Sequence, residues 1–375
     1  MLIPEDFLNS LIKSGYVQFY GVPDSLLKSF CECLDENDNV DNHIAVNEGG
    51  ALASAVGYNL ATEKAAVVYL QNSGLGNLIN PYLSIVHQSV YAIPVLMIIG
   101  WRGEPSKSDE PQHLTQGEIT EKQLQLLNIP YEILSSDSGR AKEQVVRVKR
   151  MTDNGQAAAL LVPKSTFDSD KKSPEILLCV NSFKRIDLLN SIVETIDEDT
   201  VIFSTTGKTS RELYEIRESL GMGHANDFLN VGGMGHTSQM ALAYAQNNPA
   251  KKVLCLDGDG AALMHLGAMA INGTSQRKNF YHILINNGAH ESVGGQKTVG
   301  FEIDFTRVAE ACQYSFLSCV DNFENLPSSL NRFFETKGPS FLEVQVALGS
   351  REGLSRPKEK PIERKTTFIN GNKGS

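Results

Sequence analysis

The sequence predicts an α/β protein made of two doubly wound parallel-sheet domains. Three observations predict this fold class. Short apolar runs alternate with helix-like stretches in both halves, and a length of 375 residues exceeds one ordinary domain. A charged, Ser-rich stretch, STFDSDKKSPEILLCVNSF, interrupts the alternation between the halves. We therefore expect a first domain over residues 1–167, a linker over 168–183, a second domain over 184–362 and a polar tail over 363–375 with a disordered end.

The first half begins with an amphipathic helix, MLIPEDFLNSLIKSG, which lacks the basic start and cleavage site of a signal peptide. Helices are expected from Pro23 and, with many small residues, from Glu48. The expected strands are VQFYGV, HIAV, AAVVYL, PVLMIIG and AAALLVPK. This alternation is typical of a parallel sheet covered by helices.

The second half repeats the alternation without a visible sequence repeat. Helices are expected at IDLLNSIVETI, from Ser210, at TSQMALAYA after the glycine cluster Val231 to His236, and at AALMHLGAMAING. The expected strands are TVIFSTTG, KKVLCLDGDG, FYHILINN and PSFLEVQV. A second α/β unit of similar size follows from this pattern.

Composition narrows the class of protein. The chain is 41% hydrophobic and 21% charged, which is typical of a globular protein. No run reaches about 18 uninterrupted apolar residues, so we expect no membrane span and a cytoplasmic location. A net charge of −10 argues against broad nucleic-acid binding, and it means that an anionic substrate needs local cations. Six cysteines, at positions 31, 33, 179, 255, 312 and 319, have no zinc-ligand spacing and are expected to be reduced core residues.

Polar side chains follow two strands of the second half. Gly258, Asp259 and Gly260 end one strand, and Asn286 and Asn287 end the next. Because such strand ends lie side by side at the carboxyl edge of a parallel sheet, Asp259 and Asn287 can reach one ion. Mg²⁺ prefers oxygen ligands and retains phosphate oxygens in its shell. Either motif alone would be an ordinary turn, and a calcium loop of the EF-hand type fits poorly because no acidic residue closes it.

Two further segments carry candidate residues. Gly233, Met234, Gly235 and His236 precede a helix whose N-terminus favours anions, although Met234 could equally fill a gap in the core. Glu48 stands at a strand end before a helix, where a glutamate is more often only a partner of the helix dipole.

Together these motifs resemble the thiamine diphosphate-dependent enzymes, whose signature is GDG followed by NN; here 25 residues separate Gly260 from Asn286. The resemblance implies two domains of the thiamine diphosphate-binding type, with Mg²⁺ held by the side chains of Asp259 and Asn287 and the carbonyl of Ala289. It implies that Met234 supports the bent cofactor. Further cofactor contacts are implied at Gly74, Gly207, Gly233, Gly235, His236, Gly258, Gly260 and Ala261.

The resemblance also implies that Glu48 is the catalytic glutamate, which hydrogen-bonds the pyrimidine ring of the cofactor so that the thiazolium carbon can lose its proton. The cofactor supplies the carbanion, and the protein supplies orientation. Because Glu48 would serve a cofactor bound by the second domain of another subunit, a homodimer is the smallest expected assembly.

The short chain leaves no room for the central domain of most large members. It is similar to the phosphonopyruvate decarboxylases and their relatives, the sulfopyruvate decarboxylases. The segments that carry this similarity are FYGVPDSLLK, QNSGLGNLINP, GWRGEPSKSDEPQHLTQG, STTGKTSREL and VALGSREGLSRP, with a departure at SKSDE over residues 106–110. The resemblance implies decarboxylation of 3-phosphonopyruvate, a small anionic 2-oxo acid, to phosphonoacetaldehyde and CO₂.

This reaction needs cations for the phosphonate and an acid for the intermediate left after CO₂ is lost. The candidate cations, each of which could be a solvated surface charge, are Arg102, Lys107, Lys208, Arg351 and Arg356. The candidate acids are Asp24, His113 and His290, whereas His265 is expected to be structural. Sulfopyruvate decarboxylase, an acetolactate-type carboligase and a non-catalytic thiamine diphosphate-binding protein stay open as alternatives.

Overall fold

The computed structural model describes residues 1–168, 183–351 and 353–373. The chain divides into two compact units, Met1–Glu175 with Val293–Gln296 and Ile176–Ser292 with Lys297–Ser375. Apart from its end residues Asp168 and Phe183, the predicted linker lies outside the described residues. None of the described helices has the length and apolar character that crossing a membrane requires.

The first unit is built on a six-stranded parallel sheet with the order β2-β1-β3-β4-β6-β5. The strands are β1 (Gln18–Gly21), β2 (Asp41–Ile44), β3 (Ala66–Gln71), β4 (Val95–Gly100), β5 (Tyr131–Ile133) and β6 (Ala158–Val162). From β1 the chain adds β2 on one side and β3 on the other, so the order reverses between β1 and β3. Ligands of open α/β sheets bind at the carboxyl ends of strands beside such a switch point.

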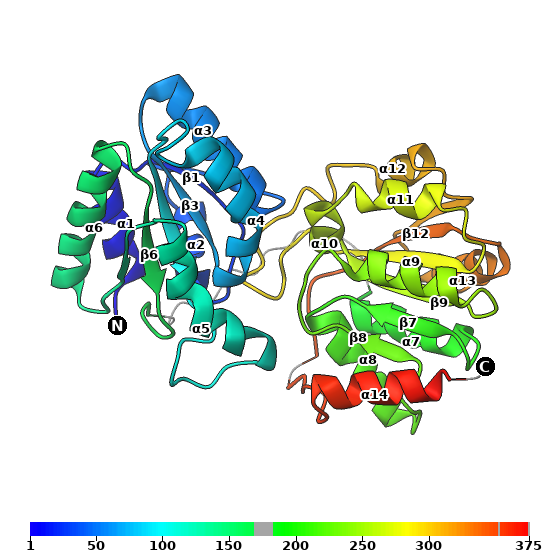
Figure 1. The fold of residues 1–375 in the computed structure, drawn as a ribbon. Helices are drawn as coiled ribbons and strands as arrows, with labels where there is room; N and C mark the ends of the chain where they lie inside the picture. Colours follow the sequence, from blue (N-terminus) through cyan, green and yellow to red (C-terminus); the bar gives the residue numbers. More distant parts are fainter. Residues whose placement is uncertain (169–182, 352, 374–375) are drawn as a thin grey trace. The chain divides into compact units, whose positions relative to one another are not determined.

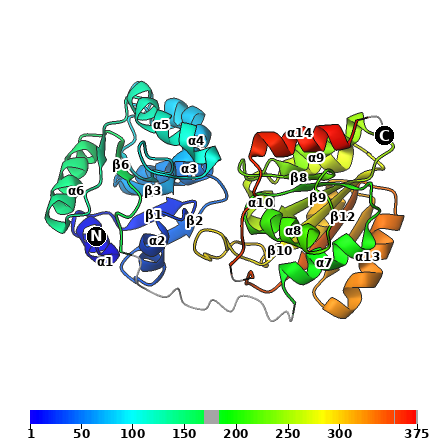
Figure 2. The ribbon, with the colours of Figure 1, turned by 90° about the horizontal axis from the view of Figure 1, so that it is seen from below.

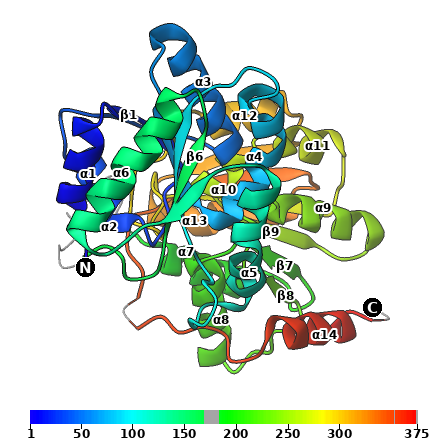
Figure 3. The same cartoon turned by 60° about the vertical axis from the view of Figure 1, so that its left-hand side comes forward.

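Helices cover both faces of this sheet (Figures 1 and 3). One face carries α1 (Pro4–Lys13), α2 (Lys28–Asp35) and α6 (Ser138–Asp153), which bury Phe7, Phe30 and Val145. The other carries α3 (Glu48–Thr62), α4 (Leu75–Pro81) and α5 (Pro111–Leu126), which bury Leu52, Leu78 and Leu124. Two short helical turns, η1 (Asn72–Gly74) and η2 (Tyr82–Val86), flank α4.

The second unit repeats this architecture with the parallel strand order β11-β12-β10-β9-β7-β8. Its strands are β7 (Val201–Ser204), β8 (Asp227–Leu229), β9 (Val253–Gly258), β10 (Phe280–Asn286), β11 (Phe316–Val320) and β12 (Ser340–Gln345). The order reverses between β7 and β9, and Asp259 directly follows β9.

Two helical layers enclose this second sheet, as Figure 2 shows. One layer contains α7 (Arg185–Thr195), α8 (Lys208–Ser219) and α13 (Leu326–Glu335), with a short turn, η3 (Phe323–Asn325), before α13. The other contains α9 (Thr237–Asn247), α10 (Asp259–Met264), α11 (Ala268–Thr274), α12 (Phe305–Ala311) and α14 (Pro361–Gly371). The doubly wound α/β class is confirmed for both units.

The C-terminal segment differs from the expected disordered tail. Residues 361–371 form helix α14, which begins with Pro361 at its first turn. Phe368 is 6% exposed, and its ring packs against those of Phe203, Phe228 and Tyr244 at centroid distances of 5.5 to 5.6 Å. One apolar residue thus anchors an otherwise polar helix, which composition alone does not reveal.

Several local expectations also need correction. The helix expected from Pro23 begins at Lys28, and AALMHLGAMAING forms two helices with a break at His265. The strands that we did not predict, β5, β8 and β11, all lie at sheet edges. Cys31, Cys33 and Cys255 are buried as expected, but Cys312 is half-buried and Cys319, on edge strand β11, is exposed. Cys179 lies outside the described residues.

Candidate active site

A buried aspartate lies at the switch point of the first sheet. Asp24 follows β1, and its carboxylate accepts hydrogen bonds from Gln71 Nε2 at 2.6 Å and from the Leu26 amide at 2.9 Å. A Cβ at Gly100 would lie 2.2 Å from Asp24 Oδ2, so the carboxylate occupies the space that a side chain would fill. Burial raises the pKa of Asp24, although these hydrogen bonds and Arg102 oppose that rise.

The Glu48 side chain lies near the end of β3, against Gly74. Glu48 is the first residue of α3, whose N-terminus is capped by Asn47 Oδ1 accepting from the Gly50 amide at 2.8 Å. Glu48 is 5% exposed, and its Oε2 accepts from Asn77 Nδ2 at 2.6 Å. A Cβ at Gly74 would lie 2.3 Å from Glu48 Oε1. The glycine therefore makes room for this carboxylate.

The loop after β4 and the first turn of α5 carry three of the other candidates. The Arg102 guanidinium forms a two-point ion pair with Asp109 and donates to Ser25 Oγ at 2.8 Å. Burial, with help from Arg102, lowers the pKa of His113 to about 4, so its imidazole is neutral at physiological pH. Lys107 is exposed and pairs with Glu104 at 2.8 Å. Because its guanidinium already pairs with Asp109 in this loop, Arg102 is less suited to bind a phosphonate.

The two side chains predicted to bind the metal lie together at the carboxyl edge of the second sheet. Asp259 is 3% exposed, and its carboxylate accepts from the Thr298 hydroxyl and from the Asn287 backbone amide. Asn287 Oδ1 accepts from the Ala289 amide at 3.1 Å. Burial raises the pKa of the Asp259 carboxyl to about 6.

These oxygens suit a hard divalent cation. Within the described ranges, the hydrogen-bond partners of Asp259 are a hydroxyl and backbone amides, not a Lys or Arg side chain. The backbone at Gly300 also passes very close to Asp259, since a Cβ on Gly300 would lie 2.8 Å from Asp259 Oδ2. A buried carboxylate without a cationic partner is costly, and a bound Mg²⁺ would offset that cost.

The neighbouring Asn286 has a different role. Its Nδ2 donates to the Gly300 carbonyl at 2.7 Å and to Glu343 Oε1 at 2.8 Å, and its Oδ1 accepts from the Gly288 amide at 3.1 Å. The Asn286 amide is therefore fully occupied inside the unit. Asn287 Oδ1 likewise accepts one backbone amide, but Asn287 is 6% exposed whereas Asn286 is fully buried.

The glycine segment after β8 packs against helix α10, which Asp259 begins. Gly233 and Gly235 have φ values of 64° and 85°, which favour glycine. A Cβ at Gly235 would lie 3.1 Å from the Ala261 carbonyl and 2.7 Å from the His265 ring. Met234 is half-buried, and the exposed His236 ring lies 4.5 Å from that of His265. His265, which we expected to be only structural, is thus a neighbour of the candidate site.

His290 covers the start of α10. A Cβ at Gly260 would lie 3.0 Å from His290 Cε1. Burial lowers the pKa of His290 to about 4, so near neutral pH its imidazole is neutral and can donate a hydrogen bond but is not a ready proton donor. Gly207, with φ of 97°, precedes α8 after β7, and a Cβ there would lie 3.0 Å from Ser292 Oγ.

The remaining candidate cations are placed unequally. Lys208 Nζ lies 3.2 Å from Glu291, whose pKa is lowered because Arg185 and Lys208 outweigh the effect of burial. Arg351 is exposed and pairs with Glu215 at 3.1 Å, and Arg356 is exposed in the loop before α14.

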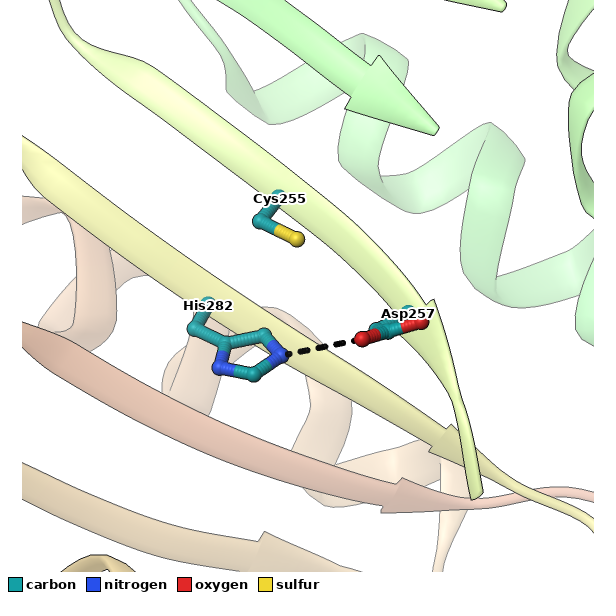
Figure 4. Close-up of side chains that lie close together, drawn as sticks. All are labelled: Cys255, Asp257 and His282. Carbon is teal, nitrogen blue, oxygen red and sulfur yellow. Dashed lines mark ion pairs between the residues drawn. The ribbon is translucent and has the colours of Figure 1, made fainter. Parts of the chain in front are cut away.

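One polar group in the core was not foreseen. Cys255 and Asp257 on β9 and His282 on β10 have ligand atoms within 4.8 Å of one another, and the His282 ring points toward Asp257 at 3.8 Å (Figure 4). Burial raises the pKa of Asp257 to about 7 and lowers that of His282 to about 4. Both shifts favour uncharged groups, as expected for polar residues enclosed between two strands.

Comparison with known proteins identifies two matching families. Residues 3–126 match the thiamine pyrophosphate enzyme, N-terminal TPP binding domain. Residues 206–344 match the thiamine pyrophosphate enzyme, C-terminal TPP binding domain. The first match contains Asp24, Glu48 and Gly74, and the second contains Asp259 and Asn287.

Three known decarboxylases are similar to this chain over both of its units. The chain is 30% identical to a phosphonopyruvate decarboxylase of Streptomyces hygroscopicus, over 97% of this chain and 92% of the relative. It is 29% identical to that of Streptomyces viridochromogenes, over 97% and 93%. It is 25% identical to a sulfopyruvate decarboxylase of Methanosarcina acetivorans, over 83% of each chain.

Proposed function

This chain belongs to the family of thiamine pyrophosphate-dependent decarboxylases, and from that premise we propose that its substrate is 3-phosphonopyruvate. The products would be phosphonoacetaldehyde and CO₂. The observation that carries the choice of substrate is the similarity to two phosphonopyruvate decarboxylases over 97% of the chain.

The proposed cofactors are thiamine diphosphate and Mg²⁺. Asp259, Asn287 and the Ala289 carbonyl would hold the metal, which keeps oxygens of the diphosphate in its shell. The backbone at Gly207, Gly233, Gly235, Gly258, Gly260 and Ala261, with the side chains of Met234 and His236, would contact the cofactor. When bound, thiamine diphosphate supplies the nucleophilic carbon and the electron sink for loss of CO₂.

The residues of the chain itself have distinct proposed roles. The Glu48 carboxylate, held by Asn77 and packed on Gly74, would accept a hydrogen bond from the pyrimidine ring and orient it. Asp24 is the proposed acid, because burial keeps its carboxyl protonated to higher pH than usual. His113 and His290 are neutral and would act as hydrogen-bond donors that orient the substrate.

Glu48→Gln tests the catalytic assignment. The variant should lose CO₂ release while it still binds thiamine diphosphate with Mg²⁺, because the metal ligands lie elsewhere. Glu143→Gln is a matched control, since the Glu143 side chain is 74% exposed on α6, and it should be as active as the unmodified protein. Equal turnover by Glu48→Gln would refute the assignment and favour a non-catalytic role for the site.

A substrate panel tests the choice of substrate. Phosphonopyruvate, sulfopyruvate and pyruvate are supplied with thiamine diphosphate and Mg²⁺, and CO₂ release is measured for each. We expect the highest kcat/KM for phosphonopyruvate. A preference for sulfopyruvate, the activity named for the relative that matches over 83% of this chain, would replace our proposal with that activity. A preference for pyruvate would refute both.

We also propose that the protein works as a homodimer or a larger assembly in which Glu48 of one copy serves a cofactor held by another. Coexpressed copies carrying Glu48→Gln and Asp259→Ala should then regain part of the activity that each variant lacks alone. No recovery in a verified mixed assembly would show that each copy works by itself.

A further inference from the structure

The mostly buried carboxylate of Glu291 contacts the proposed metal ligand Asn287. The Glu291 side chain is 11% exposed and accepts four hydrogen bonds. Its Oε2 accepts from Arg185 Nη1 at 2.6 Å and from Asn287 Nδ2 at 3.2 Å, and its Oε1 accepts from Lys208 Nζ at 3.2 Å and the Gly349 amide at 2.9 Å. A carboxylate has about four lone-pair sites, so Glu291 is saturated by these donors.

The contact determines which way the Asn287 amide faces. A carboxylate held by two cations can only accept hydrogen bonds, so Asn287 must present its NH₂ group to Glu291. The Ala289 amide can only donate, so it must face Asn287 Oδ1, at 3.1 Å. These two partners exclude the flipped amide, which would turn the NH₂ group toward a cation.

Glu291 itself cannot easily move. Arg185, 6% exposed on α7, also donates to both oxygens of Glu212 on α8, at 2.6 and 3.2 Å. Two cations and two carboxylates make the buried set neutral. Removing one carboxylate from this group would leave an uncompensated charge. The ion pairs with Arg185 on α7 and Lys208 on α8 therefore hold Glu291 in place.

We propose that Glu291 is a positioning residue that fixes the oxygen of Asn287 toward the bound metal and thereby sets the affinity of the site for Mg²⁺. This inference rests on the proposed metal site. Groups that orient a metal ligand typically change metal affinity by about 10- to 100-fold when they are removed. Glu291 also contacts Lys208, one of the candidate cations for the substrate, at 3.2 Å, so its role is tested by Mg²⁺ affinity, which loss of the Lys208 contact alone should not change.

The test is calorimetric titration of MgCl₂ into the full-length protein with saturating thiamine diphosphate. Glu291→Ala should weaken Mg²⁺ binding by about 10- to 100-fold, because Asn287 can then flip. Glu291→Gln keeps one acceptor oxygen for Asn287 and should be affected less than Glu291→Ala. Unchanged Mg²⁺ affinity in folded Glu291→Ala would overturn the inference.

A matched control separates positioning from general destabilisation. Arg217 and Asp227 form another buried ion pair in the same unit, with side chains 5% and 0% exposed, and neither contacts Asn287. Asp227→Asn should lower Tm but leave Mg²⁺ affinity unchanged. If it weakens Mg²⁺ binding as much as Glu291→Ala does, the positioning role is refuted.

The unmodified protein distinguishes this inference from the proposed function. If it binds no Mg²⁺ with thiamine diphosphate, the proposed metal site fails, and the role of Glu291 fails with it. If it binds Mg²⁺ and the Glu291 variants bind equally well, only the positioning role is refuted and the proposed function stands.

Discussion

Gly74→Ala should disable the site although it replaces no ionisable residue. Gly74 has φ of −71° and ψ of −13°, a conformation that alanine adopts freely, so backbone strain plays no part. The added methyl would lie 2.3 Å from Glu48 Oε1 and 2.5 Å from its Cδ and Cγ. These contacts are about 1 Å too short for unbonded atoms at van der Waals separation, so Glu48 must move by about that much.

The size of the effect follows from this displacement. A shift of about 1 Å in a catalytic group can lower the rate by about 10²-fold, and overpacking of a filled site costs about 1–3 kcal/mol of stability. We therefore expect kcat to fall by about 10²-fold and Mg²⁺ affinity to stay unchanged. Steady-state CO₂ release and calorimetry measure the two quantities.

Gly76→Ala is the matched control for this prediction. Gly76 lies two residues further on, in helix α4, is exposed, and a Cβ there would meet nothing within 4 Å. It should keep full activity and gain up to about 1 kcal/mol of stability. In the double variant Gly74→Ala with Glu48→Gln, activity should be no lower than in Glu48→Gln alone. Full activity of Gly74→Ala would refute the reasoning.

Two other predictions concern the second unit. Phe368→Ala should destabilise it by about 3–5 kcal/mol because α14 loses its buried ring, whereas Ile369→Ala, 45% exposed, should change Tm little; equal effects would contradict the packing. Mg²⁺ affinity should rise about tenfold per pH unit below pH 6 and level off above it, because Mg²⁺ must displace a proton from Asp259, whose pKa is about 6. In the metal-free protein the same raised pKa contributes stability below the ordinary pKa of 3.8, and this is lost as the pH rises through about 6. Calorimetry and thermal unfolding at several pH values measure both effects, with Asp259→Asn as the control that lacks the titration of Asp259 and keeps that of Asp257.

The sequence predicted the parts of the site that belong to strand ends. Asp259 and Asn287 were placed together because each follows an apolar strand of a parallel sheet, and that inference needs only the alternation of elements. Glu48 was placed in the same way, whereas the glycines before α9 were singled out because they precede the N-terminus of a helix. The central strands were predictable because they are continuously apolar, whereas the edge strands β5, β8 and β11 lack that signal.

Other contacts could not be predicted because they depend on the path of the backbone in loops. Thr298, which donates to Asp259, and Glu291, which accepts from Asn287, belong to no periodic pattern. The pairing of Arg102 with Asp109 and of Lys208 with Glu291 likewise depends on three-dimensional proximity. Their positive charge suggested substrate ligands, but the sequence carried no information about the carboxylates that engage them.

Three carboxylates of the candidate site each lie where a neighbouring glycine leaves space: Glu48 beside Gly74, Asp24 beside Gly100, and Asp259 beside Gly300. Each acid and its glycine therefore form one steric unit, and a change in either residue alters the fit of the other. For redesign of substrate range, a variant library should randomise each acid together with its glycine. Libraries that vary only the glycine would sample clashes, whereas paired changes can reshape the site while the sheets stay packed.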